Sequence, residues 1–509
     1  MASTLNLSNQ DFLAGRLYFL SNLLAGKVEN QGSITTPSGG SVYLVGSNVT
    51  NSGIINSPQG DVILAAGQSV KIFDSSTPGV RVEVTASDNA AVNLGEILAQ
   101  SGEVGIYGAM LRNTGIIDAD QVVRDASGKI VLRAKQDVTL EAGSRLSANS
   151  EQAGEITVQS ETGATLVSGT IEAKGTGEGQ TGGTVHILGQ MVNLAGAAIN
   201  ASGDAGGGLV LVGGNFHGAG PEQNSQSTSL DGSVIINADA INSGNGGRIA
   251  VWSDGDTSIG GTLTARGGAN SGDGGFIETS GKHVLLADST RVNTLAPHGK
   301  TGLWLLDPVG DYTIGAGGDQ TPAQVRTSLD SSDRLIEATN DITVAEAVTW
   351  TTPQTFELRA GNDVLVNVGA AMTASTAGSG IVLTAGNDVK VNAAMTASAE
   401  GSRIVLTAGN DVLANAKVTA TGLNAVIDMS AGRNVSVTKV TADGGGSVNS
   451  VNSVNSVNLR ANKDVIVNDA ISAAGGSVIL RADDDGTGPG LAGGTFKSLR
   501  VIFPEACFE

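Results

Sequence analysis

The feature that most restricts the fold of this chain is a repeat of about 20 to 25 residues along most of its length. An early series has the pattern Asn-x-Gly-x-Ile and begins at Asn30, Asn51, Asn93 and Asn113, at intervals of 21, 42 and 20, so the middle interval reads as two periods. A later series contains turns such as AGNDV and begins at Ala338, Ala360, Ala385, Ala408, Ala431 and Ala461. This period is typical of a solenoid, in which each repeat packs on its neighbours.

Each repeat contains strands and turns but no space for a crossover helix. In residues 380–397, GIVLTAGNDVKVNAAMTA, apolar Ile381 and Leu383 alternate with other residues, GND marks a turn, and Val389 and Val391 alternate again. Such alternation indicates half-buried strands, and Gly-Asn and Asn-Asp indicate turns. We therefore predict an all-β fold, a parallel β-helix built as a single-stranded solenoid with coils of about 20–25 residues.

The composition agrees with a narrow core and excludes several classes of protein. Glycine accounts for 73 of 509 residues, and aromatic residues for only 3%, which suits a core of small aliphatic side chains. The 29 basic and 49 acidic residues give a net charge of −20, so we expect no nucleic-acid partner. The single cysteine, Cys507, excludes a disulfide scaffold, and no apolar run approaches the roughly 20 residues of a membrane helix.

One segment that departs from the repeat has the pattern of a short helix. In residues 321–329, TPAQVRTSL, Thr321 is the expected N-cap, Pro322 the first helical residue and Gln324 the third, which makes a capping box. Val325 and Leu329 then fall on one face of the predicted helix.

Several stretches of the chain resemble filamentous-haemagglutinin-type exoproteins of the two-partner secretion pathway. ASTLNLSNQDFLAGRLYF (2–19) resembles the later part of their secretion domain, and the string VENQGSI…VILAAG (28–67) is similar to its β-helical coils. GGRIAVWSDGDTSIGGTLTARGGANSGDGGFIETSGKHV (246–284) and GKTGLWLLDPVGDYTI (299–314) resemble a region just beyond, so the resemblance covers roughly 2–345.

This resemblance implies a right-handed, pectin-lyase-like β-helix that is exported through a dedicated outer-membrane β-barrel transporter. Members of the family act mainly as adhesins, and some handle haem or carry contact-dependent toxins. An export signal and asparagine-proline motifs normally precede the segment at which this chain begins. We therefore expect Met1 to lie inside a longer reading frame or at the start of a truncated copy, and the chain to be a fragment.

The repeat and the resemblance together divide the chain into five parts. They are 1–125, the C-terminal part of a haemagglutinin-type secretion domain; 126–320, a β-helix with a polar, irregular stretch at 214–232 expected to be an extruded loop without a strand; 321–337, a short helical connector; 338–493, GND-type β-helix repeats; and 494–509, a non-repeat tail that holds Cys507. Three SVN triplets at 447–455 are extra to the repeat, and we expect them to bulge out between two coils.

A search for chemistry finds no catalytic, cofactor-binding or metal-binding residues. The four histidines, His186, His217, His283 and His298, are scattered and none has metal-ligand spacing, so we expect surface or turn positions. Neither G-x-S-x-G nor H-E-x-x-H occurs, and GKT at Gly299 lacks the earlier glycine of a phosphate loop. We predict that the chain is not an enzyme. The sequon at Asn48 allows glycosylation.

Two sets of polar turn residues are expected to stack along the solenoid. The asparagines of the early series either form an amide ladder or serve as plain turn residues. The acidic set consists of Asp341, Asp363, Asp388, Asp411 and Asp464, with Asn434 at the equivalent position. Stacked carboxylates about 5 Å apart repel one another, and calcium on the Asp363/Asp388/Asp411 turns would relieve this. The alternative, which we favour, is that each carboxylate hydrogen-bonds its own turn and faces solvent.

These observations predict an exported bacterial surface adhesin, a non-enzymatic, monomeric β-helical rod that attaches to cells or surfaces. Its expected partners are the two-partner transporter and a host-cell glycan or protein receptor, and its expected location is the cell surface or the medium. The alternatives are a β-helical carbohydrate-active enzyme, either lyase or glycosidase, and the stalk of a haem-acquisition or contact-dependent toxin exoprotein.

Overall fold

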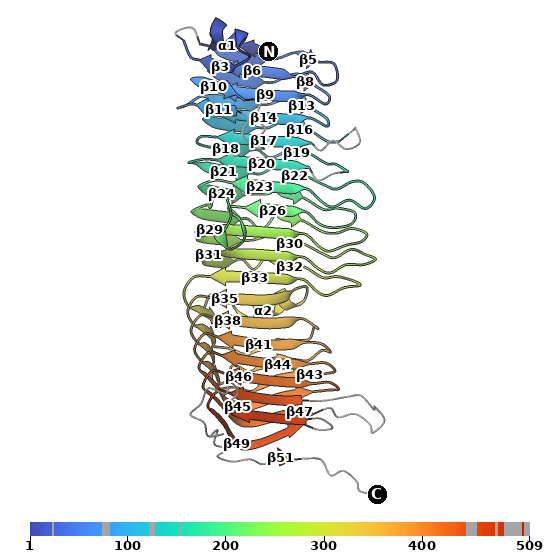
Figure 1. Cartoon of the computed structure of the whole chain (residues 1–509), viewed down its shortest axis with the longest axis vertical. Helices are drawn as coiled ribbons and strands as arrows, with labels where there is room; N and C mark the ends of the chain where they lie inside the picture. Colours follow the sequence, from blue (N-terminus) through green and yellow to red (C-terminus); the bar gives the residue numbers. More distant parts are fainter. Residues whose placement is uncertain are drawn as a thin grey trace. The chain divides into compact units, whose positions relative to one another are not determined.

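The computed structural model of the chain describes all residues except 23–24, 74–81, 122–127, 152–153, 444–455, 474–476, 483–500 and 503–509. The chain divides into two compact units, Met1–Gly302 and Leu303–Glu509. Each unit is a β-solenoid in which strands of successive coils pair in parallel, so the predicted all-β fold is confirmed (Figure 1).

Unit 1 contains two long parallel sheets and one small antiparallel sheet. The first parallel sheet consists of β1 (Ala2–Ser3), β4 (Lys27–Asn30), β6 (Val42–Gly46), β7 (Asn48–Asn51), β9 (Asp61–Ala66), β12 (Ala90–Asn93), β14 (Glu103–Gly108), β15 (Met110–Asn113), β17 (Lys129–Ala134), β18 (Val138–Leu140), β20 (Glu155–Ser160), β21 (Ala164–Val167), β23 (Thr184–Leu188), β24 (Met191–Leu194), β26 (Leu209–Val212), β27 (Ser227–Leu230), β29 (Arg248–Ile259) and β31 (Phe276–Leu286). The second consists of β5 (Ser33–Thr35), β8 (Ile54–Asn56), β13 (Glu96–Leu98), β16 (Ile116–Asp118), β19 (Arg145–Ser147), β22 (Thr170–Glu172), β25 (Ala198–Asn200), β28 (Ile235–Asn237), β30 (Thr262–Thr264) and β32 (Arg291–Asn293). The antiparallel sheet consists of β2 (Asn6–Leu7), β3 (Leu17–Leu20), β10 (Ser69–Ile72) and β11 (Val82–Thr85), and the helical segments are α1 (Asn9–Leu13) and the 3-10 turn η1 (Phe216–Gly218).

Unit 2 repeats the same plan with shorter coils. One parallel sheet holds β33 (Leu303–Pro308), β35 (Asp333–Ala338), β38 (Thr355–Ala360), β41 (Gly380–Ala385), β44 (Arg403–Ala408), β46 (Val426–Ala431), β48 (Ser456–Ala461) and β50 (Ser477–Ala482). The other holds β34 (Tyr312–Ile314), β36 (Ile342–Val344), β37 (Val348–Trp350), β39 (Val364–Val366), β40 (Met372–Ala374), β42 (Val389–Val391), β43 (Met395–Ser398), β45 (Asp411–Thr421), β47 (Asn434–Asp443), β49 (Asp464–Ala473) and β51 (Val501–Ile502). The helix α2 spans Pro322–Leu329.

The core of each unit forms because alternate residues of every strand point inward and stack on their equivalents in the next coil. In unit 1, Ile130, Ile156, Val185 and Val210 are register partners on β17, β20, β23 and β26, and all four are fully buried. Small aliphatic side chains fill this narrow interior, as the low aromatic content predicted.

The coil length agrees with the sequence period in most of unit 2 but not throughout unit 1. In unit 2, Arg334 pairs with Phe356 and Thr355 pairs with Gly380, so these coils keep the period that the AGNDV series predicted, whereas the coils from Trp304 to Arg334 and from Val426 to Ser456 are longer. In unit 1, Leu209 pairs with Arg248, and the coil between them far exceeds this period. The excess arises because a loop lies between β26 and β27.

The long interval between Asn51 and Asn93 is one coil, so our interpretation of it as two periods is wrong. β7 pairs directly with β12 and places Asn51 opposite Asn93. The additional residues include β10 and β11, which pair in the antiparallel sheet instead of extending the solenoid. Apolar and polar residues alternate in these two strands as they do in the solenoid strands. The repeat period alone therefore could not distinguish the two kinds of strand.

The structure confirms our prediction for one segment that departs from the repeat and contradicts it for another. The helix at 321–329 is confirmed, with both bonds of the Thr321–Gln324 capping box present and Val325 and Leu329 fully buried. It is shorter than the connector assigned to 321–337, because β35 begins at Asp333. The prediction that 214–232 contains no strand is wrong, because β27 lies within it and pairs with β24 and β29.

The remaining sequence predictions fall mostly outside the described residues. The SVN triplets at 447–455 lie there, as does the tail at 494–509 except for β51. Among the residues that the structure describes, no helix has both the length and the apolar character needed to cross a membrane.

Candidate functional site

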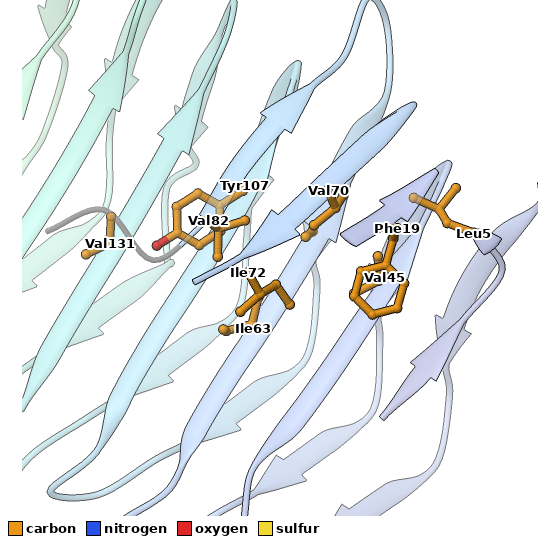
Figure 2. Packing of buried hydrophobic residues seen from close by; sticks show 10 residues of the cluster. Leu5, Phe19, Val45, Ile63, Val70, Ile72, Val82, Tyr107 and Val131 are labelled. Carbon is orange, nitrogen blue, oxygen red and sulfur yellow. The ribbon is translucent and has the colours of Figure 1, made fainter. Parts of the chain in front are cut away.

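The outer face of the first sheet of unit 1 carries an N-terminal cover. The antiparallel sheet of β2, β3, β10 and β11 packs a hydrophobic cluster against outward-facing residues of the coils (Figure 2). Phe19, Val70 and Val82 come from the cover, and Val45 and Ile63 come from the coils beneath it. The first coils therefore bury both faces of the sheet, so this end of unit 1 has a second core outside the solenoid.

A second cover, residues 213–226, lies farther along the same sheet. Its Phe216 packs on Leu211 and Ala250, and the guanidinium carbon of Arg248 lies 4.1 Å from the Phe216 ring centroid. The turn needs glycine at Gly218, which has φ +61°, because a Cβ there would lie 2.5 Å from the Trp252 ring.

Between the two covers the outer face is open and polar. Register pairs place Val131, Thr157, His186 and Leu211 in one row along β17, β20, β23 and β26. Val131 belongs to the first covered cluster and Leu211 to the second, whereas Thr157 and His186 between them are half-buried. Burial lowers the pKa of His186 in spite of the opposing charges of Glu222 and Glu155. The imidazole is therefore neutral at neutral pH.

A cleft lies where the first cover meets this open strip. It has a volume of about 380 Å³ and runs between the edge strand β11 and the ends of β14 and β17; we call it the β11 cleft. Its polar lining includes Glu83, Arg133, Lys135 and Glu161. Glu161 accepts from Arg133 Nε at 3.0 Å and from Lys135 Nζ at 3.1 Å, so it holds both cations in place. Neither cation is buried, and each keeps donor positions for a polar ligand.

The asparagines of the early repeat series form an amide ladder, as one of the two sequence interpretations predicted. Asn30 Nδ2 donates to Asn51 Oδ1 at 2.8 Å, Asn51 to Asn93 at 2.9 Å and Asn93 to Asn113 at 2.8 Å. All four side chains are buried. The ladder satisfies polar groups in the core, so these asparagines are structural.

The acidic turn residues Asp363 and Asp388 of unit 2 also stack, and they hydrogen-bond the following coil. Each carboxylate accepts from the following coil: Asp363 Oδ1 accepts from the backbone N–H of Asp388 at 3.0 Å, and Asp388 Oδ1 accepts from that of Asp411 at 3.1 Å. The alternative that we favoured from the sequence is therefore wrong in this respect. A turn carboxylate in one coil holds the backbone of the next.

Basic side chains lie beside this acidic ladder and reduce the repulsion within it. Lys390 Nζ lies 2.7 Å from Asp363 Oδ2 and 3.0 Å from Asp388 Oδ2, and Arg433 pairs with Asp411. Burial raises the pKa of Asp363, but its bonds from Lys390 and from the next coil outweigh this and lower the pKa below its ordinary value. A lysine ammonium thus occupies the position between two carboxylates that we had considered for calcium.

Glycines at the same turns allow the coils to approach closely. A Cβ on Gly386 would lie 2.1 Å from the Gly361 carbonyl oxygen, and a Cβ on Gly409 would lie 2.1 Å from that of Gly386. The same holds in unit 1, where a Cβ on Gly53 would lie 2.0 Å from the Gly32 oxygen. The high glycine content therefore follows from the spacing of the coils.

The structure places the four histidines at separate positions. His283 and His298 are exposed, His283 Nδ1 lies 2.9 Å from Asp256 Oδ1, and His217 lies in the η1 turn with φ 55°. His186 lies half-buried on β23, on the outer face of the sheet. Within either unit taken alone, no three ligand-bearing side chains converge among the described residues.

Sequence reasoning missed the two covers and the cleft between them. The signal was present, because Val62, Ile63, Leu64, Ala65 and Ala66 are consecutive and all buried, which a strand exposed on one face does not show. It also missed Arg334, a fully buried arginine on β35.

Comparisons with known proteins find similarity among solved structures. No protein-family model and no curated protein sequence matches the chain. Among solved structures, the chain is similar to the HMW1 secretion domain from Haemophilus influenzae, with 33% sequence identity, a TM-score of 0.46, and coverage of 60% of this chain and 73% of that chain.

Proposed function

We propose that the chain belongs to an exported exoprotein of the filamentous-haemagglutinin type, which leaves the cell through a two-partner outer-membrane transporter and acts by binding. One observation carries the proposal: the string 28–67, which resembles the coils of such secretion domains, folds from β4 to β9 as successive coils of a solenoid. The string 246–284 likewise forms β29, β30 and most of β31.

A binding role is supported by how the polar residues are used. The recurring asparagines and aspartates hold one coil to the next, so they serve the scaffold. Polar groups with open donor positions gather instead at the β11 cleft, on the outer face of unit 1. We assign this cleft as the contact for a glycan or a protein receptor, and we assign the solenoid as its support at the cell surface.

Export is tested by expressing the gene that encodes this chain with and without the gene of a two-partner transporter. The proposal expects the protein in the medium or on the cell surface only when the transporter is present. Equal amounts outside the cell in both strains, or retention inside the cell when the transporter is present, would contradict export by this route.

Adhesion is tested separately with variants of the cleft. Arg133→Ala combined with Lys135→Ala should weaken binding of the purified protein to cultured cells or immobilised glycans by about tenfold or more, because two charge-assisted contacts are lost. Lys129→Ala is the matched control, since Lys129 lies on β17 with Arg133, pairs with Glu155 and does not line the cleft. Equal binding by all three proteins would contradict the assignment, and breakdown of a glycan by the wild type would favour an enzyme instead.

A further inference from the structure

Arg334 is a charged residue at a position that the fold reserves for apolar side chains. It lies on β35 in an inward-facing row whose register partners are Trp304, Phe356, Ile381, Ile404, Ile427 and Val457. Arg334 and the five residues that follow it in the row are fully buried, and Trp304 is 3% exposed. Arg334 is therefore a guanidinium inside the hydrophobic core of unit 2.

The Arg334 guanidinium has a favourable contact on one face, but the N–H groups at its edge have no acceptor among the described residues. The guanidinium carbon lies 3.7 Å from the centroid of the Trp304 ring, a stacked cation–π contact. Among the described residues, Nε, Nη1 and Nη2 all lack a hydrogen-bond acceptor. Arginine stays protonated in proteins, so these N–H groups carry a charge that needs an acceptor.

A second donor without an acceptor belongs to the same part of the core. Gln320 is 1% exposed, and its Oε1 accepts from the hydroxyl of Tyr312 at 3.2 Å. Among the described residues, its Nε2 has no partner. Tyr312 lies near both groups, since burial raises the pKa of its hydroxyl and the charge of Arg334 opposes that shift. The orphaned atoms of Arg334 and Gln320 are thus all donors, and among the described residues no carboxylate forms an ion pair with the arginine.

We propose that the core of unit 2 binds a small monovalent anion of the chloride type at the edge of the Arg334 guanidinium, with the Gln320 amide as a further donor. A single anion balances the single buried charge and accepts from several N–H groups at once. Water would supply acceptors but leave the charge uncompensated, which is the costly condition for a buried ion. This inference is independent of export and adhesion.

The test uses bromide as the probe, because it replaces chloride and is detectable by anomalous diffraction. Crystals of the full chain grown in sodium bromide should show an anomalous peak beside the Arg334 guanidinium. In solution, the melting temperature should rise with the logarithm of the bromide concentration relative to sodium gluconate at equal ionic strength. Peaks only on the surface, together with equal melting temperatures in the two salts, would overturn the proposal and leave ordered water as the partner.

Two variants separate this site from a general salt effect. Arg334→Met should abolish the bromide dependence, whereas Arg359→Met, on the next strand of the same sheet, should retain it because Arg359 is exposed and pairs with Glu337 and Glu357. Persistence of the bromide dependence in Arg334→Met would contradict the site. If that variant does not fold, the diffraction and salt measurements on the wild type still decide the question.

Discussion

Glycines at the turns of the acidic ladder leave no space for a side chain, because the carbonyl oxygen of the preceding coil occupies the position that Cβ would take. A Cβ added to Gly386 would lie 2.1 Å from the Gly361 carbonyl oxygen, and because that oxygen belongs to the backbone, rotating a side chain would not relieve the clash. A substitution must therefore separate two coils and weaken the hydrogen bonds between them.

We expect Gly386→Ala to lower the free energy of unfolding by about 2–4 kcal/mol, as for other overpacked or strained sites. Urea denaturation monitored by circular dichroism measures the change. Gly378→Asn is the control, because Gly378 has φ +78° with open space around it and asparagine tolerates this conformation. Equal stability of Gly386→Ala and the wild type would show that the coils can separate there without cost.

At the scale of elements, the acidic ladder makes the stacking of β39, β42 and β45 depend on pH. The pKa of Asp363 is lower in the folded protein than its ordinary value of 3.8. The Asp363 carboxylate therefore stabilises the fold fully above pH 3.8, and this stabilisation is lost as the pH falls through the folded pKa. The pKa of Lys390 is higher in the folded protein than its ordinary value of 10.5. The Lys390 ammonium therefore stabilises the fold fully below pH 10.5, and this stabilisation is lost as the pH rises through the folded pKa. The pair thus stabilises the protein between these limits.

We expect Lys390→Met to lower the free energy of unfolding by roughly 0.5–1 kcal/mol at neutral pH, after allowance for the solvent exposure of the lysine. The difference from the wild type should shrink as the pH falls below about 4, where the carboxylates become protonated. Urea unfolding across this pH range tests it, with Lys439→Met, an exposed lysine on β47, as the control. A constant difference at all pH values would contradict the role of the carboxylates.

The SVN triplets lie outside the described residues, but the strands on either side fix the register around them. Ser456 pairs with Val426 across the triplets, and Ser477 then pairs with Ser456 at the ordinary period of the repeat. Deletion of residues 447–455 should therefore restore a regular coil and change the free energy of unfolding by about 1 kcal/mol or less. A large fall in the melting temperature would show that the triplets belong to the core.

Strands and turns could be predicted from the sequence where the same residue types recur. They were least predictable where a sheet is buried on both faces or where a charged residue lies in the core. The GND turns marked the coils of unit 2 correctly because each turn repeats the same hydrogen bonds. The β10–β11 hairpin was misread because its alternation matches that of a solenoid strand. Arg334 could not be placed, because its neighbours Asp333 and Glu337 suggest a polar segment and only register reveals the buried row. The β11 cleft depends on residues far apart in sequence, so no motif indicates it.

At the scale of the whole chain, each coil contacts mainly the coils beside it, so stability is a sum of local terms. A coil that a substitution destabilises should therefore unfold locally, together with the coils beside it, before the rest of the chain unfolds. In Gly386→Ala we expect faster amide hydrogen exchange in β38, β41 and β44, with no change in β14, β17 and β20 of unit 1. Exchange measured by mass spectrometry tests this, and uniform acceleration in both units would contradict local coupling.

At several turns, backbone N–H groups donate to carboxylates of the preceding coil, so these hydrogen bonds run in one direction along the chain. Asp120, Asp137 and Asp363 each accept from a backbone N–H of the following coil, at Asn149, Ala164 and Asp388. A finished coil therefore already displays acceptors for a coil that has yet to form. For a polypeptide that emerges N-terminus first, every new turn closes a short loop onto a prepared template, and its donors find acceptors on arrival. If the C-terminal coils formed first, each new turn would place its carboxylate against a completed coil. Its own backbone N–H groups would then have no acceptors until the preceding coil formed.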